Sequence, residues 1–226
     1  CACLVGSEMC IRDRYMIERM IKEDLLQPVD KSLIPNLDNI NEGILGQSFD
    51  LSNNYWVPYF CGNVGILYDK TVVDEKDLEA GWSILRNTKY KNQIYMYDSE
   101  RDSFMVALKA LGYSMNTTKE REINEAYQWL LEQREEMNPV YVGDESIDTM
   151  ISGVKAMAIM YSGDAAAVMS ENPNMGYYMP KEGTNVWFDG FVISKECKQT
   201  KLANEFINYM ISDKVSYKNT VEVGYL

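Results

Sequence analysis

The spacing of apolar residues along this chain alternates between a helical and an extended period. Met16, Ile17, Met20 and Ile21 follow a helical spacing, and Pro28 is expected to end that helix. Residues 82–85 are expected in a short helix. Further helices are predicted over 103–111, 117–137, 145–151, 165–171 and 199–211, and strands over 55–60, 64–68, 94–97, 140–142, 156–161, 176–179 and 191–194.

Residues suited to helix ends support these ranges. Gly112 is placed to end helix 103–111, and Thr117 with Glu120 fits a capping box for the long helix after it. Asp164 is expected to cap helix 165–171, with a ligand contact as the alternative. Strands that alternate with helices predict an α/β fold with a mainly parallel sheet and crossover helices.

Composition narrows the classes of function. The 226 residues include no His and carry a formal net charge of −12. Nucleic-acid binding depends on Lys and Arg, so the charge argues against it, and a negative field suits a cationic ligand. Without His, a Ser-His-Asp triad, a Cys-His dyad and a His-based zinc site are excluded. No apolar run approaches the roughly 18 residues of a membrane span.

Residues 1–14 stand apart from the rest of the chain. They contain Cys1, Cys3 and Cys10, show neither a helical nor a strand period, and have no signal-peptide form. They resemble the translation of a sequencing adapter and are interpreted as a non-native head. The alternative is that Cys1 is the lipidated first residue of a mature lipoprotein.

The segment around Trp187 and Asp189 carries the most specific chemistry. Two residues that lie two apart on an extended segment point to the same side. An indole ring beside a carboxylate can receive an organic ammonium group, through cation–π attraction and an ion pair. The alternative is a strand end with a core Trp and a turn-forming Asp-Gly pair.

The order of several short motifs, from about residue 15 to the end of the chain, resembles the spermidine/putrescine-binding proteins of ABC importers. The matching residues are Asp30-Lys31-Ser32, Asn54-Tyr55, Pro58-Tyr59, Cys61-Gly62, Trp82, Lys89-Tyr90-Lys91, Arg101-Asp102, residues 107–114, Tyr161-Ser162-Gly163-Asp164, Pro180-Lys181-Glu182-Gly183, Trp187-Phe188-Asp189 and Gly224-Tyr225.

The resemblance implies a two-lobed, type II periplasmic-binding-protein-like fold that closes on its ligand like a hinge. Lobe one would comprise 15–65 and return as 190–226, and lobe two would comprise 66–189. Compared with the family, lobe one is expected to be incomplete, with both ends of the chain truncated, so this chain is expected to bind its ligand weakly. Trp187 and Asp189 would lie at the hinge and face the space between the lobes.

The resemblance also implies ligand-binding roles for particular residues. Trp187 would stack on a polyamine chain, Asp189 would pair with its inner ammonium, and Asp102 would pair with a terminal ammonium, unless Asp102 only pairs with Arg101 or caps a helix. Ser99 stands where the family can have a second acid, and Asp98 and Glu100 are the neighbouring acids that could replace it. The remaining aromatic positions are Tyr161, Tyr225 and Tyr15, of which Tyr225 could instead be a turn residue and Tyr15 a helix-start residue.

The resemblance therefore implies a binding protein and not an enzyme, without a cofactor or metal. It would capture putrescine or spermidine in the periplasm or on the outer face of the membrane, and deliver the ligand to ABC permease subunits. It would act as a monomer. A lipid anchor on the full-length form is one of two alternatives, and a form without an anchor is the other. Cys61 is interpreted as a free, buried and unreactive thiol. The rival hypotheses are a same-fold receptor for thiamine, iron, a sugar or a phosphonate, a sensor domain with the same binding chemistry, and a hydrolase that uses two carboxylates such as Asp102 and Asp189.

Overall fold

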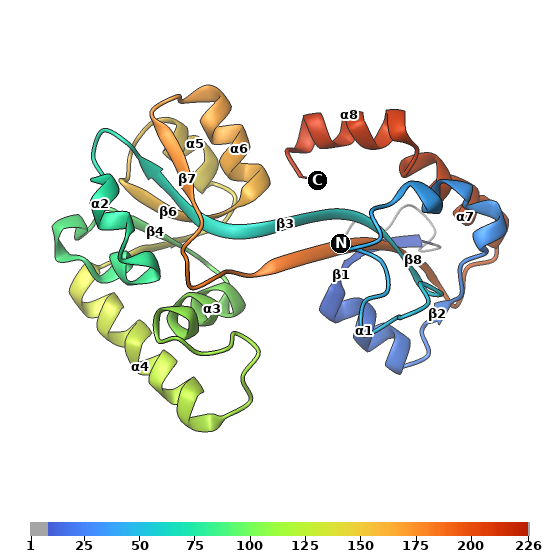
Figure 1. Ribbon diagram of the computed structural model, residues 1–226, viewed down its shortest axis with the longest axis horizontal. Helices are drawn as coiled ribbons and strands as arrows, with labels where there is room; N and C mark the ends of the chain where they lie inside the picture. Colours follow the sequence, from blue (N-terminus) through green and yellow to red (C-terminus); the bar gives the residue numbers. More distant parts are fainter. Residues whose placement is uncertain (1–8, 226) are drawn as a thin grey trace. The chain divides into compact units, whose positions relative to one another are not determined.

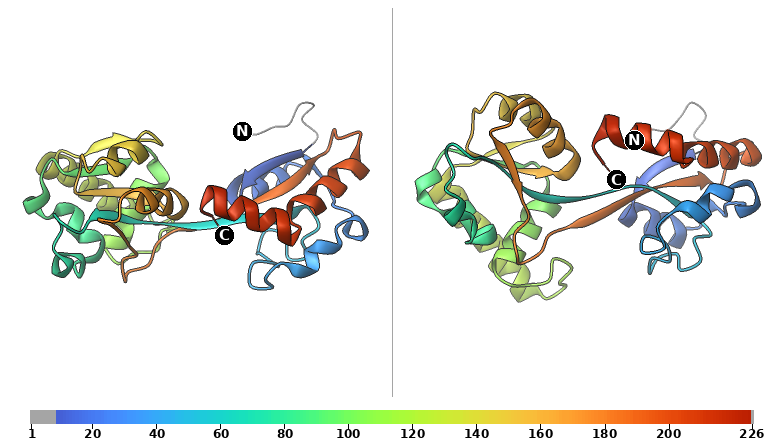
Figure 2. Two further views of the ribbon diagram at one scale, coloured as in Figure 1. Left: turned by 90° about the horizontal axis from the view of Figure 1, so that it is seen from above. Right: turned by 45° about the horizontal axis from the view of Figure 1, so that its top comes forward.

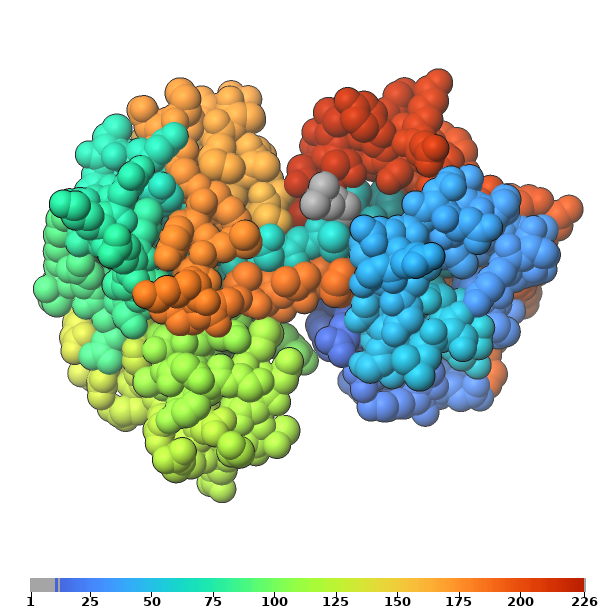
Figure 3. Space-filling view, in the orientation of Figure 1, coloured from blue at the N-terminus to red at the C-terminus, as the bar shows by residue number. Residues whose placement is uncertain are grey.

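The computed structural model describes residues 9–225, and the chain divides into two compact units. Unit 1 contains the residues up to Gly62 together with those from Trp187 onward, and unit 2 contains Asn63–Val186. The first and the last parts of the chain therefore lie side by side in unit 1 (Figure 3). Strands β3 (Trp56–Asp69) and β8 (Val186–Ser194) carry the chain from one unit to the other (Figure 1).

Unit 1 is built on a sheet in which β8 lies between β1 (Met9–Asp13) and β3. Both β1 and the short β2 (Leu26–Gln27) run antiparallel to β8. The remaining elements of the unit are α1 (Arg14–Lys22), η1 (Lys31–Leu33), η2 (Pro35–Asn39), α7 (Thr200–Met210) and α8 (Asp213–Val223).

Alternate residues of β3 and β8 bury opposite faces of this sheet. Val57, Phe191 and Ile193 pack with Ile207 of α7 on one face. On the other face, Trp56 and Val192 pack with Ile17 of α1 and Leu26 of β2. The period of two in these strands thus gives the unit two apolar layers.

The beginning and the borders of unit 1 differ from the sequence-based expectation. Residues 1–8 lie outside the described part of the chain, but residues 9–13 of the segment set aside as a head form β1, where Asp13 lies opposite Asp189. This pairing places Trp187–Asp189 in unit 1, although the residues up to 189 were expected in lobe two. Residues 63–65, expected in lobe one, belong to unit 2 because Val64 and Gly65 pair with β6 (Met157–Tyr161).

Unit 2 is a mixed sheet with helices on both faces. β4 (Ile94–Tyr97) runs parallel to its neighbours β5 (Val140–Val142) and β6, whereas β3 runs antiparallel to β6 and to β7 (Met175–Tyr178). The other elements are α2 (Glu75–Leu78), η3 (Gly81–Arg86), η4 (Thr88–Tyr90), α3 (Glu100–Ala110), α4 (Glu120–Met137), α5 (Ser146–Ile151) and α6 (Ser162–Glu171).

The two faces of this sheet are covered by different helix pairs. Ile66, Met96 and Ile159 point into a core shared with α3, α4 and η3. Their strand neighbours, such as Leu67 and Ala158, point into a second core with α5 and α6. Figures 1 and 2 show each helix pair lying side by side. The predicted α/β fold with crossover helices is therefore confirmed for this unit. The expectation of a mainly parallel sheet is wrong, because β3 runs antiparallel to β6 and β7, and β1 and β2 run antiparallel to β8.

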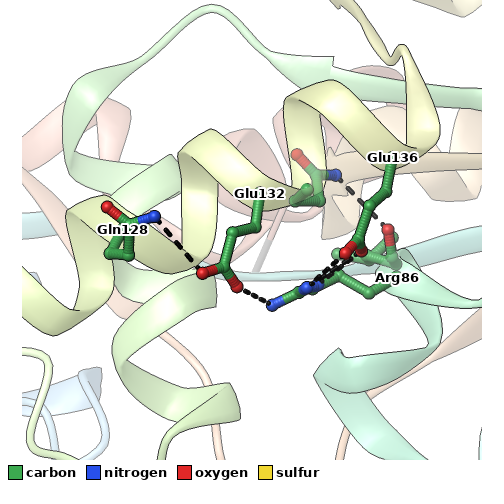
Figure 4. A network of polar contacts seen from close by, with 6 residues as sticks. Arg86, Gln128, Glu132 and Glu136 are labelled. Atoms are coloured by element: carbon green, nitrogen blue, oxygen red, sulfur yellow. Dashed lines mark hydrogen bonds and ion pairs between the residues drawn. The ribbon is translucent and has the colours of Figure 1, made fainter.

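An ion-pair network joins η3 to α4 in unit 2 (Figure 4). The Arg86 guanidinium donates from Nη1 to Glu132 Oε2 at 2.8 Å, and from Nη2 and Nε to the two carboxylate oxygens of Glu136 at 2.8 and 3.0 Å. The same guanidinium lies 5.7 Å from the centre of the Trp129 ring. The two-oxygen contact uses the planar fork of Arg, so the network fixes η3 against α4.

The structure corrects two of the expected helix caps. The capping box of Thr117 and Glu120 does not form, because Lys119 is the N-cap of α4 and the Thr117 hydroxyl bonds to Glu122 instead. Asp164 is not an N-cap either: α6 begins at Ser162, which puts Asp164 inside its first turn. Gly112 follows the end of α3 with a φ of 77°, in agreement with the predicted stop.

No helix among residues 9–225 is long and apolar enough to cross a membrane.

Candidate functional site

Trp187 and Asp189 lie on the same face of β8. Phe188 between them packs on the opposite face, in the core that contains Trp56. Gly190 is buried in mid-strand against Trp56 and the Val57 carbonyl, where any side chain would collide with both. The Asp-Gly pair is therefore not a turn, and Gly190 serves a close approach of β8 to β3.

Tyr225 packs on the indole of Trp187. The two ring centres are 4.9 Å apart in an edge-to-face arrangement, and Phe60 lies 6.3 Å from the Tyr225 ring. Gly224 makes this placement possible, because its φ of 81° ends α8 and turns the backbone. Unit 1 thus gathers an aromatic cluster of Trp187 from β8, Phe60 from β3 and Tyr225 after α8, two residues along β8 from Asp189.

The Asp189 carboxyl titrates far above the usual range. Partial burial, together with repulsion by the nearby Asp13 carboxyl and a hydrogen bond between the two side chains, raises its pKa to about 7. The backbone register explains the proximity, since Asp13 and Asp189 are directly opposed on β1 and β8. A cation bound beside Asp189 would favour its charged form.

In unit 2 the structure joins two of the candidate residues. Asp102 lies in the first turn of α3 with only 3% of its surface exposed. Its Oδ2 accepts a hydrogen bond of 2.8 Å from the Tyr161 hydroxyl at the end of β6. Tyr161 therefore positions the buried carboxylate, while its ring remains half-buried.

Ser99 is the N-cap of α3. Its hydroxyl accepts a hydrogen bond of 3.3 Å from the backbone N–H of Asp102, so it holds the helix end that places that carboxylate. The two acids beside it, Asp98 and Glu100, are both exposed. The structure thus gives Ser99 a local structural role.

Two residues of unit 2 were missed by the sequence analysis. Tyr97 ends β4, donates a 2.8 Å hydrogen bond to Asp144 Oδ1, and packs edge-to-face on Tyr161 with ring centres 4.9 Å apart. Asp144 follows β5, which is parallel to β4. The available signal was that polar residues after neighbouring parallel strands meet at one edge of the sheet.

Two further residues from the sequence analysis, Tyr15 and Cys61, belong to unit 1. Tyr15 lies in the first turn of α1 and is 46% exposed. Cys61 is a free thiol but is only half-buried, and burial raises its pKa, which lowers its reactivity near neutral pH. Within residues 9–225, no group of three or more Cys, Asp or Glu is placed to hold a metal ion.

Comparison with known proteins gives a family and a fold. The sequence profile of the bacterial extracellular solute-binding proteins matches residues 7–219. The spermidine/putrescine-binding periplasmic protein of Salmonella typhimurium is 28% identical over 96% of this chain and 62% of its own length. The putrescine/cadaverine-binding protein of Pseudomonas aeruginosa is also 28% identical, over 97% of this chain and 65% of its own length.

A solved structure agrees with these sequence matches. The spermidine/putrescine ABC transporter substrate-binding protein of Streptococcus pneumoniae aligns with a TM-score of 0.84 and 35% identity, over 96% of this chain and 66% of that one. The expected type II periplasmic-binding-protein fold is confirmed. The chain spans about two thirds of the length of these relatives. The chain belongs to the family of bacterial extracellular solute-binding proteins.

Proposed function

We propose that this protein binds a polyamine such as putrescine or spermidine on the outer side of the cell membrane and delivers it to an ABC permease. The observation that carries the proposal is the indole of Trp187 beside the Asp189 carboxylate on one face of β8, with Tyr225 against the indole. Relatives named for spermidine, putrescine and cadaverine binding support it.

The chemistry of these groups matches that of a polyamine. Such a ligand is a flexible methylene chain with ammonium groups several carbons apart. Aromatic rings cover its methylenes and attract its charges, at about 0.5–2 kcal/mol for each cation–π contact. A hydrogen bond between a carboxylate and an ammonium contributes about 1.5–3 kcal/mol. A few such groups therefore account for the roughly 8 kcal/mol of micromolar binding, after the cost of ordering the ligand.

Both units contribute carboxylates in this proposal. In unit 1, Asp189 would pair with an ammonium group beside the Trp187 indole, and in unit 2, Asp102 would pair with an ammonium group beside Tyr161. The formal net charge of −12 assists the approach of a polycation. Ligand roles of Tyr15 and Ser99 remain part of the proposal, although Ser99 already caps α3.

A thermal-shift panel on this 226-residue chain tests the proposal. We expect putrescine, spermidine or spermine at millimolar concentration to raise the unfolding temperature, because a ligand that binds only the folded state stabilises it. Thiamine and ferric citrate are the competing solutes, and a monoamine such as butylamine controls for charge alone. A shift with thiamine or ferric citrate and none with a polyamine would replace the proposal by a same-fold receptor for that solute.

A further inference from the structure

The carboxyl ends of three neighbouring parallel strands meet at one edge of unit 2. Tyr97, the last residue of β4, is in register with Val142, the last residue of β5. β6 runs parallel to β4 on its other side and ends at Tyr161. Residues that follow these strands therefore gather at one edge, where α/β sheets characteristically bind ligands.

Two tyrosines and two carboxylates form a connected group at this edge. The rings of Tyr97 and Tyr161 pack edge-to-face. Each hydroxyl donates a 2.8 Å hydrogen bond to a different carboxylate, Tyr97 to Asp144 and Tyr161 to Asp102. The ring contact thus links the exposed Asp144 to the buried Asp102.

The negative charge of this group is concentrated. Partial burial and the hydrogen bond to Asp144 raise the pKa of Tyr97, and the charges of Asp144, Asp164 and Asp102 raise it further. All three acids therefore act on a single hydroxyl. None of the ion pairs within residues 9–225 includes Asp102 or Asp144.

Buried carboxylates in proteins are normally paired with a cation. Asp102 is 3% exposed, lies in the first turn of α3 and accepts the hydrogen bond of the Tyr161 hydroxyl, and none of the ion pairs within residues 9–225 provides it with a cationic side chain. An external cation at this edge would supply the missing counter-charge, and the two ring edges would flank its carbon chain.

We propose that Asp144, held by Tyr97, is a second carboxylate for a primary ammonium terminus of the ligand, beside Asp102. This inference rests on the proposed polyamine function. It adds that unit 2 binds a terminal, primary ammonium group of the ligand. A primary ammonium has three N–H donors, which Asp102, Asp144 and a tyrosine oxygen accept between them. Asp144 then supplies the negative charge that is absent at the position of Ser99. Acetylation of the ligand amine removes its positive charge and two of its three N–H donors.

An NMR titration of the ¹⁵N-labelled 226-residue chain with spermidine tests this, because it detects binding even at millimolar dissociation constants. We expect Asp144→Asn to weaken spermidine binding about tenfold, the lower end of the effect of one charge-assisted hydrogen bond. Tyr97→Phe keeps the ring but releases Asp144, and should weaken binding severalfold. A spermidine derivative acetylated on both primary amines should bind the wild type no better than it binds Asp144→Asn.

Asp148→Asn is the matched control, since Asp148 is an exposed acid of α5 in the same segment and bonds through its backbone carbonyl only. It should bind spermidine like the wild type. If Asp144→Asn also binds spermidine like the wild type, or if Asp144→Asn weakens binding of the acetylated derivative as much as it weakens binding of spermidine, the inference is wrong while the polyamine function stands. If the wild type binds no polyamine at all, the proposed function fails and the inference with it.

Discussion

The two units hold their candidate carboxylates in opposite ways. In unit 1, Asp189 lies beside a second acid, Asp13, and its pKa rises to about 7. In unit 2, Asp102 accepts a hydrogen bond from Tyr161 within the first turn of a helix, where the dipole favours negative charge. The charge of Asp189 thus depends on pH and on a cation, whereas the position of the Asp102 side chain is fixed by its own unit before a ligand arrives.

The largest expected effect comes from Asp189→Asn. At pH 8 we expect this change to weaken polyamine binding by about 2–5 kcal/mol, because an ammonium loses its counter-charge. The ligand-free protein should become more stable at the same pH, because the ionised Asp189 is disfavoured by burial and by Asp13. An NMR titration with spermidine measures the first quantity and urea unfolding the second.

Opposite signs of these two effects distinguish a ligand-binding carboxylate from a structural one. Asp38→Asn serves as the control, since Asp38 is an exposed acid in unit 1 and should change neither quantity by more than about 0.5 kcal/mol. An unchanged affinity in Asp189→Asn would remove Asp189 from the site. The different environments of Asp189 and Asp102 would then have no bearing on ligand binding.

The pH dependence of binding should be the next largest effect. Below pH 7, a cation that pairs with Asp189 must first displace a proton, so we expect affinity to fall about tenfold between pH 8 and pH 6. Calorimetry at several pH values measures it. Asp189→Asn should abolish most of this dependence, and a dependence that persists in that variant would assign it to another group.

The stability of the ligand-free protein should have its own pH dependence. The pKa of Asp189 is raised on folding from an unfolded value of about 3.9, so its favourable contribution is complete below about pH 4 and is lost as the pH rises through about 7. Asp13→Asn should move this loss to lower pH but not to the ordinary range, because burial, the larger cause, remains.

Much of the fold follows from the sequence because its signals are local. The period of two in residues 94–97 and the glycine at Gly112 predict a strand and a helix end that the structure contains. Helix α8 was missed because none of its residues is buried, so no apolar stripe marks it. The capping box of Thr117 failed because a nearby acid, Glu122, competed for the hydroxyl.

For the candidate residues, too, the sequence predicts what is local along the chain and misses contacts between distant segments. The alternation along β8 predicts that Trp187 and Asp189 share a face, and Phe188 on the opposite face agrees. By contrast, the contact of Tyr97 with Asp144 joins residues that are far apart in the chain. It depends on which strands are neighbours in the sheet, and a single sequence does not contain that information in any local pattern.

The smallest expected effect tests the hydroxyl that supports Asp102. Tyr161→Phe keeps the ring against Tyr97 and removes the 2.8 Å hydrogen bond, so we expect binding to weaken and the free energy of unfolding to fall, each by about 1 kcal/mol. Arg86→Lys is the control: it loses the two-oxygen contact with Glu136 and should lower stability by about 0.5–1 kcal/mol without changing affinity. Equal losses of affinity in both variants would mean that any loss of stability in unit 2 weakens binding. The specific role of the Tyr161 hydroxyl in positioning Asp102 would then have to be abandoned.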